Sequence, residues 1–219
     1  MLTITFAAAK GGSGKTTLSA HVACLASALG LSVTMLDTDP QGSLIRWWQA
    51  RKADTPAMGT TTAAGFKAWL ATQDKAGTDL VIVDTPPTIS RDMGVYITAS
   101  DLICIPTRPS PHDLHSVQST IDVCEKAGRP MVFLINGAAN RARITADAIQ
   151  QLSQHGPVGP TVHQRTDFAT SMIDGRTVQD IDPGSRSAAE VKALWTYIHH
   201  RATKLASKPA ILHARMHAR

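Results

Sequence analysis

A run of glycine, lysine and hydroxyl residues near the start of the chain is suited to holding phosphate groups. Residues 10–17 read Lys-Gly-Gly-Ser-Gly-Lys-Thr-Thr. Glycines let backbone N–H groups turn toward phosphate oxygens, a lysine neutralises the phosphate charge, and a hydroxyl coordinates magnesium. The pattern G-x-x-x-x-G-K-S/T is not met, because Ala9 stands at its first position. The phosphate-binding groups are nevertheless present, in Gly11, Gly12, Gly14, Lys15 and Thr16.

Three aspartates that follow apolar runs would extend this chemistry to hydrolysis. Asp84 comes directly after Leu-Val-Ile-Val, where a carboxylate can hold magnesium through water while Thr16 binds the ion directly. Asp37 and Asp39 are two residues apart, so an extended chain points both to one side, where either can orient or deprotonate an attacking water. Plainer interpretations stay open, with Asp84 as a helix N-cap and the Asp37–Asp39 pair as turn caps before a helix at Ser43.

Short apolar runs and helix-length segments alternate along the chain and would position these residues. We expect strands at 2–8, 32–37, 80–84, 102–106 and 131–135, and helices at 17–29, 43–53, 63–75, 113–127, 145–155 and 187–205. The alternation predicts an α/β fold, with a mostly parallel, doubly wound sheet between two layers of helices. Ligands of such sheets bind at the carboxyl ends of the strands, which is where the glycine loop and the aspartates fall.

Length and composition favour one domain with a full core. The chain has 219 residues and is 43% hydrophobic, and we expect a single domain over 1–205 followed by a disordered basic tail over 206–219. We expect no signal peptide or N-terminal DNA-binding module, because the glycine loop begins so close to Met1, and no apolar run reaches the length of a membrane span. Cys24, Cys104 and Cys124 lie in apolar segments and are expected to be buried thiols in a reducing cytoplasm.

The basic excess of the chain is concentrated at its C-terminal end. Up to Ser185 there are 15 Lys and Arg against 16 Asp and Glu, whereas from Arg186 onward there are seven basic residues against Glu190 alone. This concentration indicates a surface that binds a polyanion, either nucleic acid or an anionic membrane. A solvated helix with a frayed tail would give the same charge pattern. Trp195, on the apolar stripe of the last predicted helix, is expected to be a packing residue.

Several segments together resemble the ParA/MinD family of ATPases, whose phosphate loop is a deviant Walker A motif. The resemblance is carried by KGGSGKTT, LDTDPQGS and VIVDTPP, and the last two favour the ParA branch. PTRPSPHDLHS, beginning at Pro106, and RTDFATSMIDGRTV, beginning at Arg165, also resemble ParA sequences, so the similarity extends from Met1 to about Arg201.

The resemblance implies ATP or ADP and Mg²⁺ as ligands and assigns roles to individual residues. Lys10 matches the family's signature lysine, which reaches the partner's phosphates in an ATP-dependent homodimer. Lys15 matches the phosphate-loop lysine, Asp39 a carboxylate required for hydrolysis, and Asn136 an amide that reads adenine. Nucleotide binding is implied for Gly11, Gly12, Ser13, Gly14, Lys15, Thr16 and Thr17, and magnesium binding for Thr16, Asp37 and Asp84.

The resemblance also implies a function, with the cargo left open. ParA-type dimers bind DNA without sequence preference, and Arg186, Lys192, Arg201 and Lys204 are the candidates here, with Arg141, Arg143 and Arg165 as alternatives. We expect a cytoplasmic, nucleoid-associated ATPase of weak basal activity that segregates plasmid or chromosomal DNA with a ParB-like adaptor. The alternatives are positioning of a protein cargo, such as a chemoreceptor cluster or microcompartment, MinD-like cycling on a membrane, and a metabolic enzyme of the same fold. Membrane binding is disfavoured by Pro209 and the small apolar area of the tail.

Overall fold

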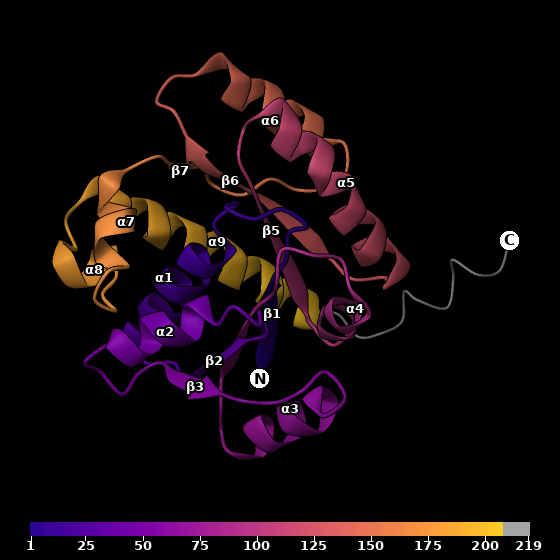
Figure 1. The fold of residues 1–219 in the computed structure, drawn as a ribbon, viewed down its shortest axis with the longest axis vertical. Helices are drawn as coiled ribbons and strands as arrows, with labels where there is room; N and C mark the ends of the chain where they lie inside the picture. The colour runs from indigo at the N-terminus through magenta and orange to yellow at the C-terminus, as the bar shows by residue number, and fades with distance from the viewer. Residues whose placement is uncertain (208–219) are drawn as a thin grey trace, which may run out of the picture.

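A seven-stranded parallel sheet forms the centre of the computed structural model, which describes residues 1–207 (Figure 1). The strand order is β3-β2-β4-β1-β5-β6-β7, and every neighbouring pair is parallel. The strands are β1 (Leu2–Phe6), β2 (Val33–Asp37), β3 (Ala57–Gly59), β4 (Leu80–Asp84), β5 (Leu102–Thr107), β6 (Met131–Ala138) and β7 (Val162–His163). The five predicted strands are all present, and β3 and β7 are additional edge strands too short to show an apolar run.

Helices follow most of the strands and cover both faces of the sheet. They are α1 (Lys15–Ala28), α2 (Ser43–Ala50), α3 (Phe66–Lys75), α4 (Arg91–Thr98), α5 (Pro111–Lys126), α6 (Arg143–Ser153), α7 (Thr166–Ser171), α8 (Val178–Ile181) and α9 (Arg186–Ala206). Six of these were predicted to within a few residues. The sequence prediction missed α4, α7 and α8, which are at most eight residues long and therefore show little periodicity.

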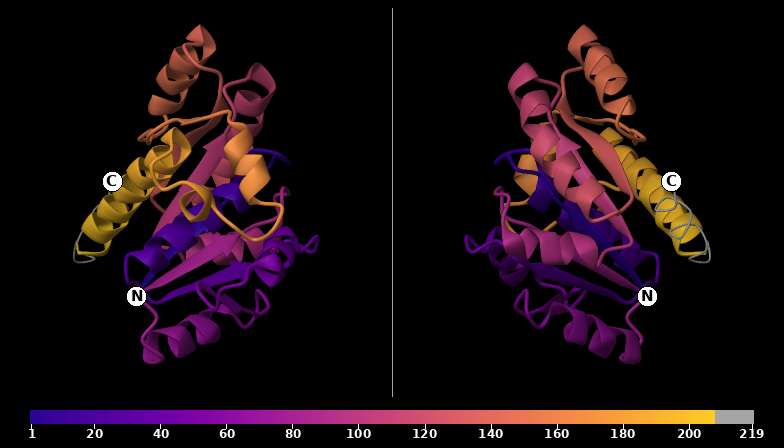
Figure 2. Two further views of the ribbon diagram at one scale, coloured as in Figure 1. Left: turned by 90° about the vertical axis from the view of Figure 1, so that its left-hand side faces the viewer. Right: turned by 90° about the vertical axis from the view of Figure 1, so that its right-hand side faces the viewer.

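The two faces of the sheet carry separate cores because side chains alternate along each strand. Ile4, Phe6 and Ile82 belong to the core under α1, α2 and α9, whereas Val81 and Val83 pack against α3 and α4 on the opposite face. Helices α5 and α6 complete that opposite layer. Figure 2 shows α9 on one side of the sheet and α4 and α5 on the other. The predicted three-layer α/β fold is confirmed.

The last helix is an integral part of this fold. Val191, Leu194, Trp195 and Ile198 of α9 are buried in the first core, so Trp195 is a packing residue as predicted. The three cysteines are also buried. The expected tail lies outside the described residues from position 208 onward. Within residues 1–207 no helix is both long and apolar enough to cross a membrane.

Candidate nucleotide-binding site

The glycine loop connects the carboxyl end of β1 to the first turn of α1. Gly12 and Gly14 have φ angles of 73° and 101°, in the left-handed region that glycine adopts without strain. A Cβ atom on Gly14 would lie 2.0 Å from Nδ2 of Asn136, so no larger residue fits there. Gly14 is also the N-cap of α1, and no side chain caps this helix end. The backbone N–H groups of the first turn are thus available to an anion.

Lys15 places a positive charge beneath the loop. Its side chain is buried, and its Nζ donates hydrogen bonds to the carbonyl oxygens of Ala8 and Lys10, each at 3.2 Å. Burial lowers the pKa of Lys15, and the nearby Asp84 and Asp39 oppose this shift. A phosphate group would supply the negative charge that this buried ammonium lacks, so the loop fits a phosphorylated ligand.

Thr16 and Asp84 meet at the edge of the loop. The Thr16 hydroxyl donates to Oδ2 of Asp84 at 2.6 Å, and the Ser19 hydroxyl lies 3.4 Å from Oδ1. Asp84 is only 1% exposed, and burial raises its pKa to about 7. A cation beside this carboxylate would offset the cost of burying its charge, and oxygen ligands of this kind suit Mg²⁺.

A magnesium ion at this point would also need ligands from the nucleotide. Within residues 1–207 no cluster of three or more His, Cys, Asp or Glu side chains is arranged to hold a metal. Magnesium is commonly bound by one or two protein groups together with substrate phosphates. Thr16 and Asp84 fit that arrangement, in which the metal and the nucleotide bind as a unit.

Asp37 and Asp39 serve different parts of the structure. One oxygen of Asp37 accepts from the backbone N–H of Asp39 at 3.0 Å, and the other accepts from Leu44 and Ile45 at 2.9 and 3.0 Å. Asp37 therefore caps the first turn of α2, as the plainer interpretation held, and its place in a magnesium shell stays a prediction. Asp39 lines the cavity beside the loop, with its Oδ1 accepting from the Gln41 N–H at 2.9 Å.

The side chain of Lys10 pairs with α5 and not with the glycine loop. Its Nζ is 3.0 Å from Oδ2 of Asp113 in the first turn of α5, and 38% of its side chain is exposed. The Ser110 hydroxyl also contacts the Asp113 carboxylate. An ion pair within the same chain therefore holds this half-buried lysine, and the sequence spacing gave no reason to expect that pair.

A cavity of about 400 Å³ opens above the loop, at the lower end of the usual range for small-molecule sites. Asn136 reaches its wall from β6 and donates to the Ser13 carbonyl oxygen at 2.8 Å, so here it supports the loop, and its reading of adenine stays a prediction. Sequence reasoning missed most of the remaining wall, which is formed by Pro87, Arg108, Gly137, His163, Gln164, Phe168 and Ala169.

Arg165 also lines this cavity and is held in place from α9. Its Nη2 lies 2.6 Å from Oε1 of Glu190, which also accepts from the His163 ring nitrogen at 2.9 Å. The charge of Arg165 is thus paired within the same chain. The sequence signals for this wall were three of the family-like runs, those that end at Pro87, begin at Pro106 and begin at Arg165.

The DNA-binding candidates lie along α9, away from the cavity lining. Arg186, Lys192 and Lys204 are exposed on the polar face of the helix. Arg201 is half-buried, and its Nε is shielded from solvent without a hydrogen-bond partner among the described residues. Lys192 and Lys204 are therefore better placed than Arg201 to contact a polyanion.

Comparison with known proteins gives consistent matches over most of the chain. Residues 4–178 match the CobQ/CobB/MinD/ParA nucleotide binding domain. The chain is 30% identical over 202 residues to the maintenance of carboxysome distribution protein A of Halothiobacillus neapolitanus, a match that covers 86% of this chain and 91% of the relative. It is 33% identical over 115 residues to Protein ParA of Rhizobium radiobacter, covering about half of each chain (52% and 51%).

The fold comparison agrees with these matches. A chain of the MinC:MinD cell division protein complex from Aquifex aeolicus superposes with a TM-score of 0.78, covering 91% of this chain and 96% of that one at 14% identity. At this identity the likeness concerns the fold alone.

Proposed function

The chain belongs to the CobQ/CobB/MinD/ParA family of nucleotide-binding domains, and from this premise we propose that it is a ParA-type ATPase that positions a cargo. The observation that carries the proposal is the pair of buried charges, Lys15 and Asp84, at the glycine loop, with half-buried Thr16 bonded to Asp84. A buried ammonium beside an uncapped helix end suits the phosphates of ATP, and the buried carboxylate suits the magnesium that accompanies them.

We assign the hydrolytic step to residues around the cavity. The loop backbone and Lys15 bind the phosphates, and Thr16 and Asp84 would hold magnesium, which supplies neutralising charge to the phosphate oxygens when bound. Asp39, which lines the cavity, would orient the attacking water or accept a proton from it. Lys10 would leave Asp113 and reach the phosphates of a second copy, so that ATP promotes a homodimer. In that dimer the basic face of α9 would bind nucleoid DNA without sequence preference.

Two kinds of cargo, a protein assembly and DNA, are compatible with this family. The match to the carboxysome distribution protein spans most of both chains, whereas the match to Protein ParA spans about half of each. This difference favours a protein assembly as cargo, delivered through an adaptor protein. Plasmid or chromosomal DNA with a ParB-like adaptor is the second candidate, supported by the match to Protein ParA and by the ParA-like motifs.

Binding of labelled duplex DNA with ATP, with ADP and with a non-hydrolysable ATP analogue tests the switch. We expect retention with ATP and the analogue, little retention with ADP, and ATP turnover that is lost in the Lys15→Ala variant. Equal DNA binding in all three nucleotide states would overturn the switch, and absence of ATP turnover with any partner would overturn the ATPase assignment.

Deletion of the gene in its host separates the two cargoes. Rapid plasmid loss or anucleate cells would indicate DNA segregation. Clustering of a protein assembly in cells that inherit their DNA normally would indicate positioning of a protein cargo.

A further inference from the structure

A groove on the helical layer opposite α9 has no part in the nucleotide site. It lies among α3, α4 and α5 and has a volume of about 820 Å³, roughly twice that of the nucleotide cavity. Its floor is apolar, with partly buried Leu70 and Val123 and with Val95, which is 37% exposed. The groove therefore presents apolar surface that the described part of the chain leaves uncovered.

Basic side chains surround this apolar floor. Each contributing segment supplies at least one, and the four are Lys67, Arg91, Lys126 and Arg129. No acidic residue lines the groove, and none of the four forms an ion pair with any residue in 1–207. Up to Ser185 the chain has 15 basic and 16 acidic residues, so the excess of basic residues around the groove is local.

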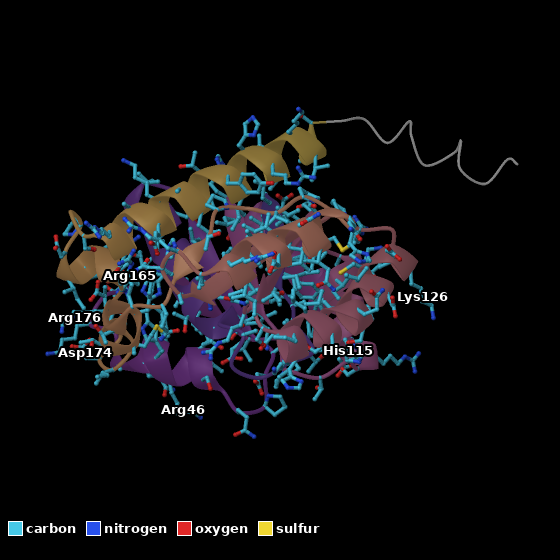
Figure 3. All side chains as sticks on the ribbon, turned by 90° about the horizontal axis from the view of Figure 1, so that it is seen from above. Arg46, His115, Lys126, Arg165, Asp174 and Arg176 are labelled. Carbon is cyan, nitrogen blue, oxygen red and sulfur yellow. The ribbon has the colours of Figure 1, made fainter. Side chains whose placement is uncertain are left out.

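The groove is also far from the surfaces already discussed. It runs along the whole of α4 and past the C-terminal end of α5, and none of the residues that line it also lines the nucleotide cavity. Lys126, on the groove, and Arg165, on the nucleotide cavity, are on opposite sides of the molecule (Figure 3). A ligand in the groove would thus leave both the nucleotide site and α9 free.

We propose that this groove docks an acidic amphipathic helix of a partner protein. Such a helix has apolar side chains at helical spacing that would cover Leu70, Val95 and Val123, and flanking carboxylates that would pair with the basic rim. DNA would satisfy the rim but would leave the apolar floor uncovered, because its backbone offers only charge. An acidic helix complements both features at once, and the proposal does not depend on ATP hydrolysis or dimerisation.

A synthetic peptide provides the probe. A fluorescein-labelled helix with leucine on one face and glutamate on the other should bind the full chain, with or without nucleotide, as measured by fluorescence anisotropy. A peptide of the same composition in scrambled order should bind at least about tenfold more weakly, because it presents no apolar face. Equal binding of the two peptides would show that the groove attracts charge alone, and would overturn the proposal.

Two variants locate the binding. Lys126→Glu with Arg129→Glu, and separately Val95→Asp, should each weaken peptide binding about tenfold or more, whereas the control Lys75→Glu, at the exposed end of α3, should not. Binding of a fluorescent ADP should be unchanged in all of them, which checks the fold and keeps this test separate from the proposed ATPase. Full peptide affinity in both groove variants, or loss of DNA binding on reversal of Lys126 and Arg129, would overturn the docking site.

Discussion

Asp84 illustrates how burial prepares a side chain for a charged ligand. It ends β4 directly beside Asp37 at the end of β2, and its nearest donor is the Thr16 hydroxyl. Burial raises its pKa to about 7, so in the absence of ligand the protein is destabilised when this carboxylate ionises. The same feature that favours cation binding therefore costs stability in the empty protein.

The Asp84→Asn variant should remove this cost. The pKa in the folded protein lies above the ordinary value of 3.8, so the contribution of Asp84 to stability is complete below about pH 4 and is lost as the pH rises toward 7. The rise in the pKa of Asp84 corresponds to a loss of at most roughly 4 kcal/mol in the free energy of unfolding. We expect the variant to gain free energy of unfolding relative to the natural chain between pH 4 and 7.5, in urea denaturation without nucleotide or magnesium.

His21 makes the comparison with the variant necessary. This buried residue of α1 has its pKa lowered to about 4 by burial, so its contribution is present above about pH 6.5 and is lost as the pH falls. Between about pH 4 and 6.5 the effects of His21 and Asp84 on stability oppose each other. The stability of the natural protein alone would therefore change little with pH on account of these two groups together. A variant-minus-natural difference that is constant with pH would exclude Asp84 as the source.

The ion pair of Lys10 gives a second prediction for a single residue. If Lys10 must leave Asp113 to act on a partner's nucleotide, Asp113→Asn should increase the fraction of ATP-dependent dimer. The pair is partly exposed and worth up to about 1 kcal/mol, which corresponds to roughly a fivefold shift in the equilibrium. Light scattering at a fixed ATP concentration would measure the fraction of dimer. Asp122→Asn, also on α5, is the control.

The opposite result would assign Asp113 a different role. Weaker dimerisation of Asp113→Asn would mean that Asp113 supports the dimer. In either case Lys10→Ala should abolish the ATP-dependent dimer while the monomer still binds nucleotide.

Among the elements, β7, α7 and α9 are tied together by one acidic side chain. Glu190 of α9 accepts from the His163 backbone N–H at 3.0 Å as well as from the side chains of His163 and Arg165. Burial opposes its charge, but these hydrogen bonds prevail and hold the pKa of Glu190 below its usual range. Glu190 thus connects the wall of the nucleotide cavity to the helix that carries the basic surface.

Glu190→Gln should loosen this wall while leaving the glycine loop intact. We expect a loss of about 1–3 kcal/mol in the free energy of unfolding at neutral pH, because Arg165 loses a half-buried charged partner. Nucleotide affinity should fall severalfold, as measured by titration with fluorescent ADP. The control is Glu125→Gln at the exposed end of α5. Unchanged nucleotide affinity would show that Glu190 serves packing alone.

On the scale of the whole molecule, charge is divided between the two faces of the sheet. The polar face of α9 carries exposed Lys192 and Lys204, and the α3–α4–α5 groove on the opposite helical layer carries its own basic rim. This division would allow one face to bind DNA while the other contacts a protein.

Reversing the charge of α9 tests the first of these surfaces. Lys192→Glu with Lys204→Glu should weaken DNA retention and reduce the slope of log affinity against log salt by about 2, since roughly one counterion is released per phosphate contact. Basal ATP turnover should stay unchanged. Lys52→Glu with Lys75→Glu makes the same change of charge at exposed positions elsewhere. An equal loss in both double variants would show that net charge, and not α9, governs binding.

The chain by itself determined the parallel α/β architecture and the glycine loop, because apolar runs, glycines and the Lys15–Thr16 pair are local in sequence. Tertiary structure alone decided which groups the charged side chains contact. Asp37 turned to cap α2, Lys10 paired with Asp113, and Glu190 reached His163 and Arg165, since each contact depends on which segments the fold brings together. The short elements β7, α7 and α8 form by packing against the rest of the molecule, and their periodicity is too brief to be read in advance.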